Sequence, residues 1–389
     1  MGYRVEIVSN RKRLKDFLDL PYRVYANDPN WIAPMRSETK RILDTARNPY
    51  FKDVRLQLFN CYYSGQISAR VAIVINPAHH KKYGGKTAFF GFFESLNYAE
   101  AIIVLFRAVS EYCKQNRITG LEGPFNPNHY NELGLLASHF DVPPVFFQPY
   151  NPPYYQSLLE LAGFRIHKQV HTLCNTDIAG YIANQFPSIP VDAGGNYRLR
   201  TLRRNRLAEE LENLRTVFND AFEDNWQFLP LSKSEYVFSA RYLDLVTPPD
   251  FIRFVEYDGV PVAALHCTLD INPLLKNFHG RFNLPAYLRL RKNIRKSDTL
   301  VIFAFGVKKA HRHSVALPLL IQACKKIAMN YRVMITTWTS DDNRAAKRVG
   351  DVFGLTRDRE LVIMTKSISV HTGHEYVQSP PAGRVDGKQ

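Results

Sequence analysis

The chain has 389 residues, of which 45% are hydrophobic and 13% aromatic, a composition that belongs to a globular protein and excludes a disordered or low-complexity chain. Lys and Arg outnumber Asp and Glu by 51 to 36, which gives a formal net charge of +15 and indicates acidic partners such as phosphorylated cofactors, anionic lipid or nucleic acid. At this length we expect two domains, since about 100 to 200 residues per domain is usual.

Targeting signals are not evident in the sequence. It contains no run of about 18 apolar residues, and its N-terminal stretch MGYRVEIVSN lacks the apolar centre of a signal peptide. The five cysteines are scattered and form no CxxC pair, as is typical of reduced core thiols in a cytosolic protein. We therefore expect a cytoplasmic protein and leave open a peripheral contact with the inner membrane surface. The histidines show no metal-ligand spacing, so we expect no metal.

The first half of the chain is predicted to alternate strands and helices. A strand at 3–8 precedes a helix over 12–25, which Pro21 should end or kink. Ser64 and Gly65 form the tight turn of a hairpin with strands at 54–63 and 66–76. The later predicted elements are an aromatic strand at 87–94 that ends in Glu94, a helix over 99–116, a strand at 118–123, a strand-like stretch at 143–150 and a helix over 153–162 that Gly163 caps.

The stretch 187–195, PSIPVDAGG, is the expected linker. It divides the chain into an N-terminal domain at 1–186 and a C-terminal domain at 196–369, with a flexible tail at 370–389. After the linker we predict a strand at 197–202, a helix over 206–222, a hairpin over 252–270 that turns at Asp258-Gly259, strands at 299–305, 333–338 and 360–366, and a helix over 343–353. The same order of elements occurs in both halves, which suggests two copies of one α/β unit.

The stretch 299–330 joins a buried strand to a helix through a basic turn. Lys309, His311, Arg312 and His313 lie where the free amides and the positive dipole end of the helix favour phosphate or pyrophosphate. The alternative is an ordinary strand-turn-helix unit with basic residues on its loop.

With these elements assigned, the C-terminal unit resembles a GNAT (Gcn5-related N-acyltransferase) domain through its hairpin, the FGV strand at 305–307, the His311-Arg312 loop and SDDNRAAKRVGDVFGL at 340–355. The N-terminal unit resembles a second copy through NPPYYQSLLELAGF at 151–164. The whole chain is similar to a bacterial family of tandem GNAT-like proteins, to which the bacterial ceramide synthases are closely related. The motifs are FFGFFE at 89–94, GPFNPN at 123–128, NELGLL at 131–136, PYNPPYY at 149–155 and DNWQFLPL at 224–231.

The resemblance implies an α/β (α+β) fold of two tandem GNAT-like domains, each a mixed twisted sheet flanked by helices. It also implies an N-acyltransferase that moves an acyl group from a thioester, either acyl-CoA or an acyl carrier protein thioester, to an amine. The acceptor would be a small molecule or a lipid amine such as a sphingoid-type long-chain base. The expected cofactor-binding residues are Val307, Lys309, His311, Arg312, His313, Ser314, Val315 and Asn343.

The basic loop departs from the GNAT pattern at two positions. GNAT loops place small residues there, because glycine lets backbone amides close on the CoA pyrophosphate. This chain has Val315 and Leu317 instead. The alternative function is therefore a non-catalytic GNAT-like binding module with a degenerate CoA loop.

Candidate catalytic groups gather in the first half. N-acyl transfer needs a base for the attacking amine, an oxyanion stabiliser and an acid for the leaving thiolate. Glu94 is the first candidate base, and an ordinary strand-end carboxylate is the alternative. The other candidates are Asn126, Asn128, Asn131 and Glu132 of a polar loop that forms either a substrate pocket or a turn network, and Tyr150 and Tyr155 as sources of a phenol acid.

Two basic clusters complete the sequence. The segment 281–296, inside an expected insertion at 276–298, alternates apolar and basic residues, as an amphipathic helix on an anionic membrane does. A solvated basic face is the alternative. The arginines around Arg203 are compatible with nucleic-acid binding by their charge, but no recognised nucleic-acid motif accompanies them. We therefore do not expect a nucleic-acid partner. The oligomeric state and the identity of the active copy stay open.

Overall fold

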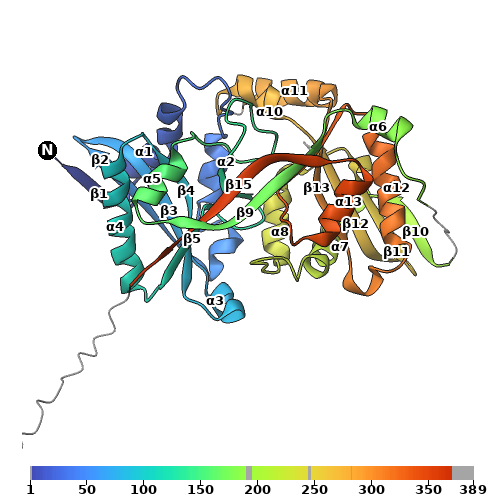
Figure 1. Cartoon of the computed structure of the whole chain (residues 1–389), viewed down its shortest axis with the longest axis horizontal. Helices are drawn as coiled ribbons and strands as arrows, with labels where there is room; N and C mark the ends of the chain where they lie inside the picture. The colour runs from blue at the N-terminus through green and yellow to red at the C-terminus, as the bar shows by residue number, and fades with distance from the viewer. Residues whose placement is uncertain (1, 190–194, 244–246, 282, 370–389) are drawn as a thin grey trace, which may run out of the picture.

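The computed structural model describes residues 2–189, 195–243, 247–281 and 283–369. The predicted tail at 370–389 and most of the predicted linker lie outside these residues. Thirteen strands form one sheet in the order β1-β2-β3-β4-β5-β15-β9-β14-β13-β12-β11-β10, with β8 paired to β15 (Figure 1). The pairs β4–β5 and β13–β14 are parallel and their neighbours are antiparallel, so the predicted mixed α/β class is confirmed.

The first half of the chain contributes one edge of the sheet. Its strands are β1 (Tyr3–Ile7), β2 (Arg55–Tyr63), β3 (Gln66–Ile75), β4 (Thr87–Ser95), β5 (Gly120–Gly123), β8 (Leu135–Leu136) and β9 (Arg165–Asn175), with a separate ribbon of β6 (Phe125–Asn126) and β7 (Glu132–Leu133). Its helices are α1 (Arg11–Val24), α2 (Arg36–Ile42), α3 (Pro77–Tyr83), α4 (Ala99–Gln115), α5 (Tyr155–Leu161) and α6 (Ile178–Asn184).

The second half contributes the other edge. Its strands are β10 (Tyr197–Thr201), β11 (Ile252–Tyr257), β12 (Val260–Leu269), β13 (Thr299–Val307), β14 (Val333–Thr336) and β15 (Thr356–Ser367). Its helices are α7 (Leu207–Ala221), α8 (Lys233–Ser239), α10 (Asn272–Leu275), α11 (Leu284–Asn293), α12 (Ala316–Ala328) and α13 (Arg344–Val352). The structure describes no helix that is long and apolar enough to cross a membrane.

The two halves repeat one arrangement and exchange their last strands. Strands β1 to β5 and β10 to β14 follow the same order from the two edges of the sheet. The strand that ends the first half, β9, pairs with β14 of the second half, and β15 of the second half pairs with β5 of the first. Both exchanged strands cross the middle of the molecule in Figure 1. Each half therefore needs the other to complete its sheet, while the predicted domain boundary stays a prediction.

Helices cover both faces of each half. On β3, Val71 belongs to the apolar cluster that includes α4, and the next residue, Ala72, belongs to the cluster that includes Phe17 of α1. Because successive side chains of a strand point to opposite faces, α4 and α1 lie on opposite sides of the sheet. In the second half, Val255 packs with α12 and Phe254 with α7, in the same way.

One expectation about local structure is wrong: the stretch 143–150 forms no strand, because its three prolines cannot donate to a ladder. Of the two outcomes expected at Pro21, an end or a kink, the first does not occur, since the helix α1 continues to Val24. Proline lacks an N–H, so the carbonyl of Phe17, four residues earlier, loses its helical partner. The guanidinium of Arg70 replaces that partner by donating to this carbonyl over 2.5 Å.

Candidate functional site

A cavity of about 1240 Å³ lies between the two halves and is lined by both. Its volume exceeds the roughly 300 to 1,000 Å³ of sites that hold drug-sized ligands. The walls include aromatic side chains from both halves, among them Phe146, Phe147, Trp226 and Phe303. The seven residues predicted as catalytic all line it: Glu94, Asn126, Asn128, Asn131, Glu132, Tyr150 and Tyr155.

Glu94 is held in the cavity wall by three side chains. Its Oε2 accepts a hydrogen bond of 2.6 Å from the Tyr155 hydroxyl, and its Oε1 lies 3.7 Å from Nη2 of Arg70. Tyr25 supplies another hydroxyl to the same carboxylate. Burial raises the pKa of Glu94 above its usual value, and the Arg70 charge and the two hydroxyls counteract that rise. A partly desolvated carboxylate with a raised pKa is suited to accept a proton near neutral pH.

A bulge in β4 brings Glu94 and Arg70 together. Arg70 pairs with Glu94 in the ladder and Ala72 pairs with Gly91, so Phe92 and Phe93 both lie opposite Val71. Phe92 has a φ of 48°, which a non-glycine residue seldom adopts. Bulges of this kind redirect side chains and are frequent beside active sites.

Asn126 links the bulge to a second carboxylate. Its Oδ1 accepts a hydrogen bond of 2.6 Å from the backbone N–H of Phe92, and its Nδ2 donates to Oε2 of Glu132 over 3.3 Å. Desolvation raises the pKa of Glu132, and the charge of Glu94 raises it further. Two carboxyl groups that interact therefore line the same part of the cavity, where they can attract an ammonium group.

The remaining predicted catalytic residues make structural hydrogen bonds. Oδ1 of Asn128 accepts from the backbone of Tyr130 at 3.1 Å and from Nδ2 of Asn131 at 2.8 Å, which matches the turn network considered for this loop. The hydroxyl of Tyr150 bonds to Asp28 Oδ2 at 2.8 Å. The hydroxyl of Tyr155 donates to Glu94 and accepts from the backbone N–H of Ser95 at 2.8 Å. Tyr155 is buried and therefore positions Glu94.

The second half opens a strand edge to the same cavity. The parallel ladder of β13 and β14 ends at the pair Ile302 and Thr336. A bulge at Phe303 follows, and the β13 residues from Ile302 to Val307 line the cavity. In the first half, by contrast, Asn126 occupies the corresponding gap beside β4. An extended ligand can therefore pair with the backbone of β13.

The cations of the predicted cofactor loop pair with nearby acids. Lys309 Nζ lies 3.0 Å from Glu223 and 2.7 Å from Asp224, and Arg312 Nη1 lies 3.4 Å from Asp224. Asp224 is exposed, so an incoming phosphate can compete with it for these cations. Val307, Arg312 and His313 line the cavity.

The other predicted cofactor residues lie further from the cavity or fix local structure. His311 Nδ1 bonds to the Tyr197 hydroxyl at 2.9 Å. Ser314 Oγ accepts from the N–H of Ala316 at 3.1 Å, and Val315 directly precedes α12. Asn343 caps α13 by accepting from the N–H of Ala346 at 3.1 Å and also lines the cavity.

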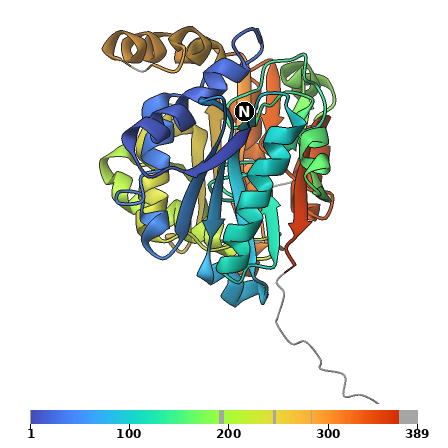
Figure 2. The ribbon, with the colours of Figure 1, turned by 90° about the vertical axis from the view of Figure 1, so that its left-hand side faces the viewer.

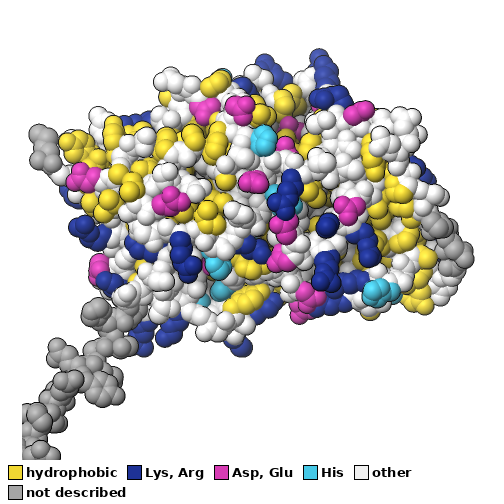
Figure 3. All heavy atoms as spheres, in the orientation of Figure 1, with side chains coloured by type: hydrophobic (Ala, Val, Ile, Leu, Met, Phe, Trp, Pro, Cys, Tyr) yellow, Lys and Arg dark blue, Asp and Glu magenta, His cyan; other side chains and the backbone are white. Residues whose placement is uncertain are grey.

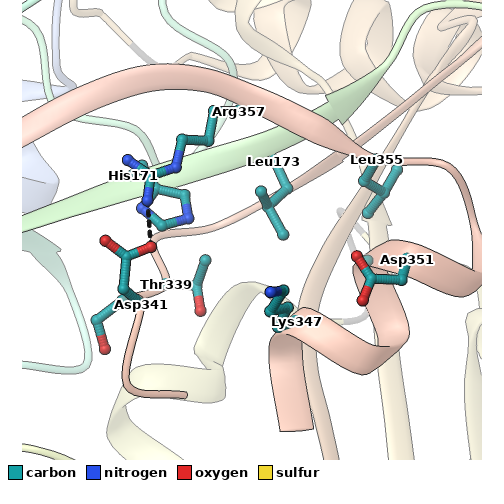
Figure 4. Close-up of a pocket in the computed structure, with 10 residues that line it drawn as sticks. His171, Leu173, Thr339, Asp341, Lys347, Asp351, Leu355 and Arg357 are labelled. Carbon is teal, nitrogen blue, oxygen red and sulfur yellow. Dashed lines mark hydrogen bonds and ion pairs between the residues drawn. The ribbon is translucent and has the colours of Figure 1, made fainter. Parts of the chain in front are cut away.

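A smaller pocket of about 350 Å³ lies between β9, β15 and α13 (Figure 4). His171 and Arg357 come from the two exchanged strands, and Lys347 and Asp351 come from α13. Arg357 forms an ion pair with Asp341. The pocket shares Thr339 and three other wall residues with the large cavity, but none of the predicted site residues line it.

Sequence reasoning missed Arg70 and Tyr25. Arg70 interrupts the strand QISARVAIVI, which is otherwise apolar from Ala69 onward. A single arginine in a buried strand requires an anionic or carbonyl partner, and that signal was available. Tyr25 follows α1 directly and gives no comparable sign. Among the described residues, no cluster of three or more His, Cys, Asp and Glu side chains suits a metal ion.

Comparisons with known proteins agree with this architecture. No protein-family model matches the chain. The chain is 28% identical over 379 residues to a protein named bacterial ceramide synthase from Caulobacter vibrioides, covering 93% of this chain and 96% of that one. It is also 28% identical over 326 residues to protein YghO of Escherichia coli, covering 81% of this chain and 82% of that one.

Solved structures share the fold at low sequence identity. A tandem GNAT protein from the clavulanic acid biosynthesis pathway matches with a TM-score of 0.53 at 12% identity, over 95% of this chain and 99% of that one. A probable N-acyltransferase from Enterococcus faecalis matches with a TM-score of 0.55 at 9% identity, over 95% of this chain and 74% of that one. The chain therefore has the tandem GNAT fold, and the predicted resemblance to tandem GNAT-like proteins and to bacterial ceramide synthases is confirmed.

Proposed function

We propose that the protein is an N-acyltransferase that joins the acyl group of a thioester to an amine carrying a long apolar chain. The observation that supports this most is the position of Glu94, whose pKa is raised and which lines a large cavity with an apolar wall. The shared fold and the name of the Caulobacter vibrioides relative support acyl transfer as the class of reaction.

The proposed acceptor is an amphiphilic amine of the sphingoid type. Its charged head would lie near Glu94 and Glu132, because two carboxylates attract an ammonium group. Its chain would lie along the aromatic wall that includes Phe147 and Phe303, where each buried CH₂ contributes roughly 0.8 kcal/mol.

In the proposed reaction the bound ammonium group first loses one proton to solvent, and the neutral amine then attacks the thioester carbonyl. The C–N bond forms as the carbonyl becomes tetrahedral, and Glu94 takes the proton that the nitrogen loses. The C–S bond then breaks, the proton passes to the leaving sulfur, and the products are an amide and a free thiol. Tyr155 and Tyr25 hold the carboxylate in place, and Arg70 keeps it ionised at lower pH than burial alone would allow.

The donor would enter from the second half. Its extended arm would pair with the edge of β13 beyond Ile302, and its phosphates would contact Arg312 and His313. Both acyl-CoA and an acyl carrier protein present such an arm. The bulky side chains of Val315 and Leu317 restrict access of a pyrophosphate to the backbone amides of the loop. They therefore favour a donor whose phosphates are bound less by backbone amides.

The test is acyl transfer by the purified full chain with each donor and with amines of increasing chain length. We expect thiol release that requires the amine, an amide product in the mass spectrum, and a kcat/KM that rises with chain length. No thiol release from either donor, together with no coenzyme A binding in calorimetry, would instead favour the non-catalytic binding module with a degenerate CoA loop. Thiol release that is independent of chain length would overturn the lipid-amine acceptor.

A further inference from the structure

The surface around α11 combines exposed cations with exposed apolar side chains. From Lys276 to Ser297 the sequence has seven Lys and Arg residues and no Asp or Glu. Leu284 and Leu288 are 69% and 58% exposed, and they lie one helical turn apart on the same face. Arg289, Lys292 and Arg295 are exposed beside them.

The cations of this surface have no acidic partners among the residues that the structure describes. Arg291 donates to the Tyr287 hydroxyl at 3.3 Å, but no ion pair joins any of the seven to a described Asp or Glu. The other basic cluster differs in this respect. Arg200 lies 2.6 Å from Glu210, and Arg203 contacts the same carboxylate at 2.9 Å. The seven cations around α11 therefore form a local cluster of positive charge without acidic partners among the described residues.

The opposite face of α11 covers the large cavity. Ala286, Leu290 and Ile294 are buried in the apolar core cluster of the second half. Leu290 also lines the cavity, together with Ile271 and Leu275 of the preceding segment. Figure 2 shows α10 and α11 at an outer edge of the molecule, and Figure 3 shows dark blue Lys and Arg side chains along that edge.

We propose that the outer face of α11 docks onto an anionic lipid bilayer. The cations would lie at the headgroup level, and Leu284 and Leu288 would enter the acyl boundary, as in interfacial helices. Exposed leucines between the cations favour lipid over nucleic acid, whose phosphates offer no apolar partner. Docking would place the part of the cavity wall that includes Ile271, Leu275 and Leu290 next to the bilayer. An amphiphilic ligand can then enter the cavity from the lipid.

The experiment is co-sedimentation of the full chain with vesicles of phosphatidylcholine alone and of phosphatidylcholine mixed with phosphatidylglycerol. We expect binding to the mixed vesicles, weakened by salt, and little binding to the neutral ones. In the variant Arg289→Gln/Lys292→Gln/Arg295→Gln each lost cation should lower partitioning about fivefold, so the total loss is on the order of a hundredfold. This measurement does not depend on catalysis.

Two further variants separate the possible outcomes. The control Lys52→Gln/Arg107→Gln/Lys326→Gln removes three exposed cations elsewhere and should bind vesicles as the wild type does. The variant Leu284→Ser/Leu288→Ser should lose vesicle binding although its charge is unchanged. Equal losses in the charge variant and its control would overturn the proposal. So would binding to a DNA or RNA duplex in the absence of vesicle binding, which would assign the surface to nucleic acid.

Discussion

Replacing Tyr155 with Phe tests how Glu94 is held, without requiring a substrate. The Tyr155 hydroxyl donates a hydrogen bond of 2.6 Å to Glu94 and accepts one of 2.8 Å from the backbone N–H of Ser95. A hydrogen bond to an ionised group contributes about 1.5 to 3 kcal/mol, and one between neutral groups contributes about 0.5 to 1.5 kcal/mol. The cost of Tyr155→Phe should therefore increase by about 1 kcal/mol as Glu94 ionises.

The sign of this pH dependence follows from burial. Because the folded-state pKa of Glu94 is raised from 4.5, the carboxyl is protonated in the folded protein at low pH and ionises only above its ordinary value. The difference in unfolding free energy between wild type and variant should thus be small below about pH 4.5 and larger after the carboxyl ionises. The assay is urea unfolding of both proteins across this pH range.

Tyr154→Phe is the matched control. Tyr154 donates to the carbonyl of Ser95 at 2.9 Å and makes no hydrogen bond to Glu94. Its substitution removes one hydroxyl beside the same strand but should leave a cost that does not change with pH. If Tyr155→Phe and Tyr154→Phe show the same pH-independent cost, Tyr155 does not stabilise an ionised Glu94 and the account of this site is wrong.

Three other substitutions or truncations test the fold around the site. Burial raises the pKa of Glu122 to about 7, so its ionisation destabilises the fold as pH rises. In urea unfolding, Glu122→Gln should be more stable than wild type by roughly 3 kcal/mol above pH 7 and equally stable below pH 4.5. A difference in unfolding free energy that does not change with pH would contradict this. A Cβ on Gly91 would lie 1.8 Å from the carbonyl oxygen of Phe125, so Gly91→Ala should lower the free energy of unfolding by at least about 3 kcal/mol in thermal unfolding. The control Gly85→Ala should change it little, because a Cβ there meets only ordinary contacts. Equal effects of the two substitutions would refute the close approach at Gly91. Fragments divided at 187–195 should not fold separately and should copurify when coexpressed, because β9 and β15 are exchanged; cooperative unfolding of either fragment alone would contradict this.

Local patterns predicted much of the fold. The hairpins at Ser64-Gly65 and Asp258-Gly259 form where turn residues separate two apolar runs. The predicted helix over 99–116 corresponds to α4, and the predicted strand at 87–94 corresponds to β4 with Glu94 near its end. These elements depend on short-range periodicity and turn chemistry, which a single sequence displays.

The exchange of the last strands could not be predicted in this way. Strand β15 contains the apolar run Leu361 to Met364, which indicates burial but not which neighbours bury it. Its ladders to β5 and β9 join residues that are far apart in the chain. The same limit applies to Arg70, because its partner Glu94 depends on a bulge that the apolar pattern of β4 does not reveal.

The positions of the candidate residues were predicted better than their roles. Asn128, Asn131 and Tyr155 line the cavity, but the two asparagines bond to each other and the Tyr155 hydroxyl bonds to Glu94. The basic loop was expected from its place between a strand and a helix and from the GNAT resemblance. Its pairing with Glu223 and Asp224 depends on the segment after α7. A polar motif therefore indicated residues that line the cavity, and the packing around them determines which groups are available to a ligand.

The most direct test of the central claim is the amount of amide that the Glu94→Gln variant forms from a thioester and a long-chain amine, measured by mass spectrometry. Loss of a general base lowers the rate by about 10² to 10⁴-fold, and we expect a loss of that size. Glu100→Gln, on the exposed start of α4, should form amide as the wild type does. Amide formation by Glu94→Gln at the wild-type rate would contradict the assignment of Glu94 as the base.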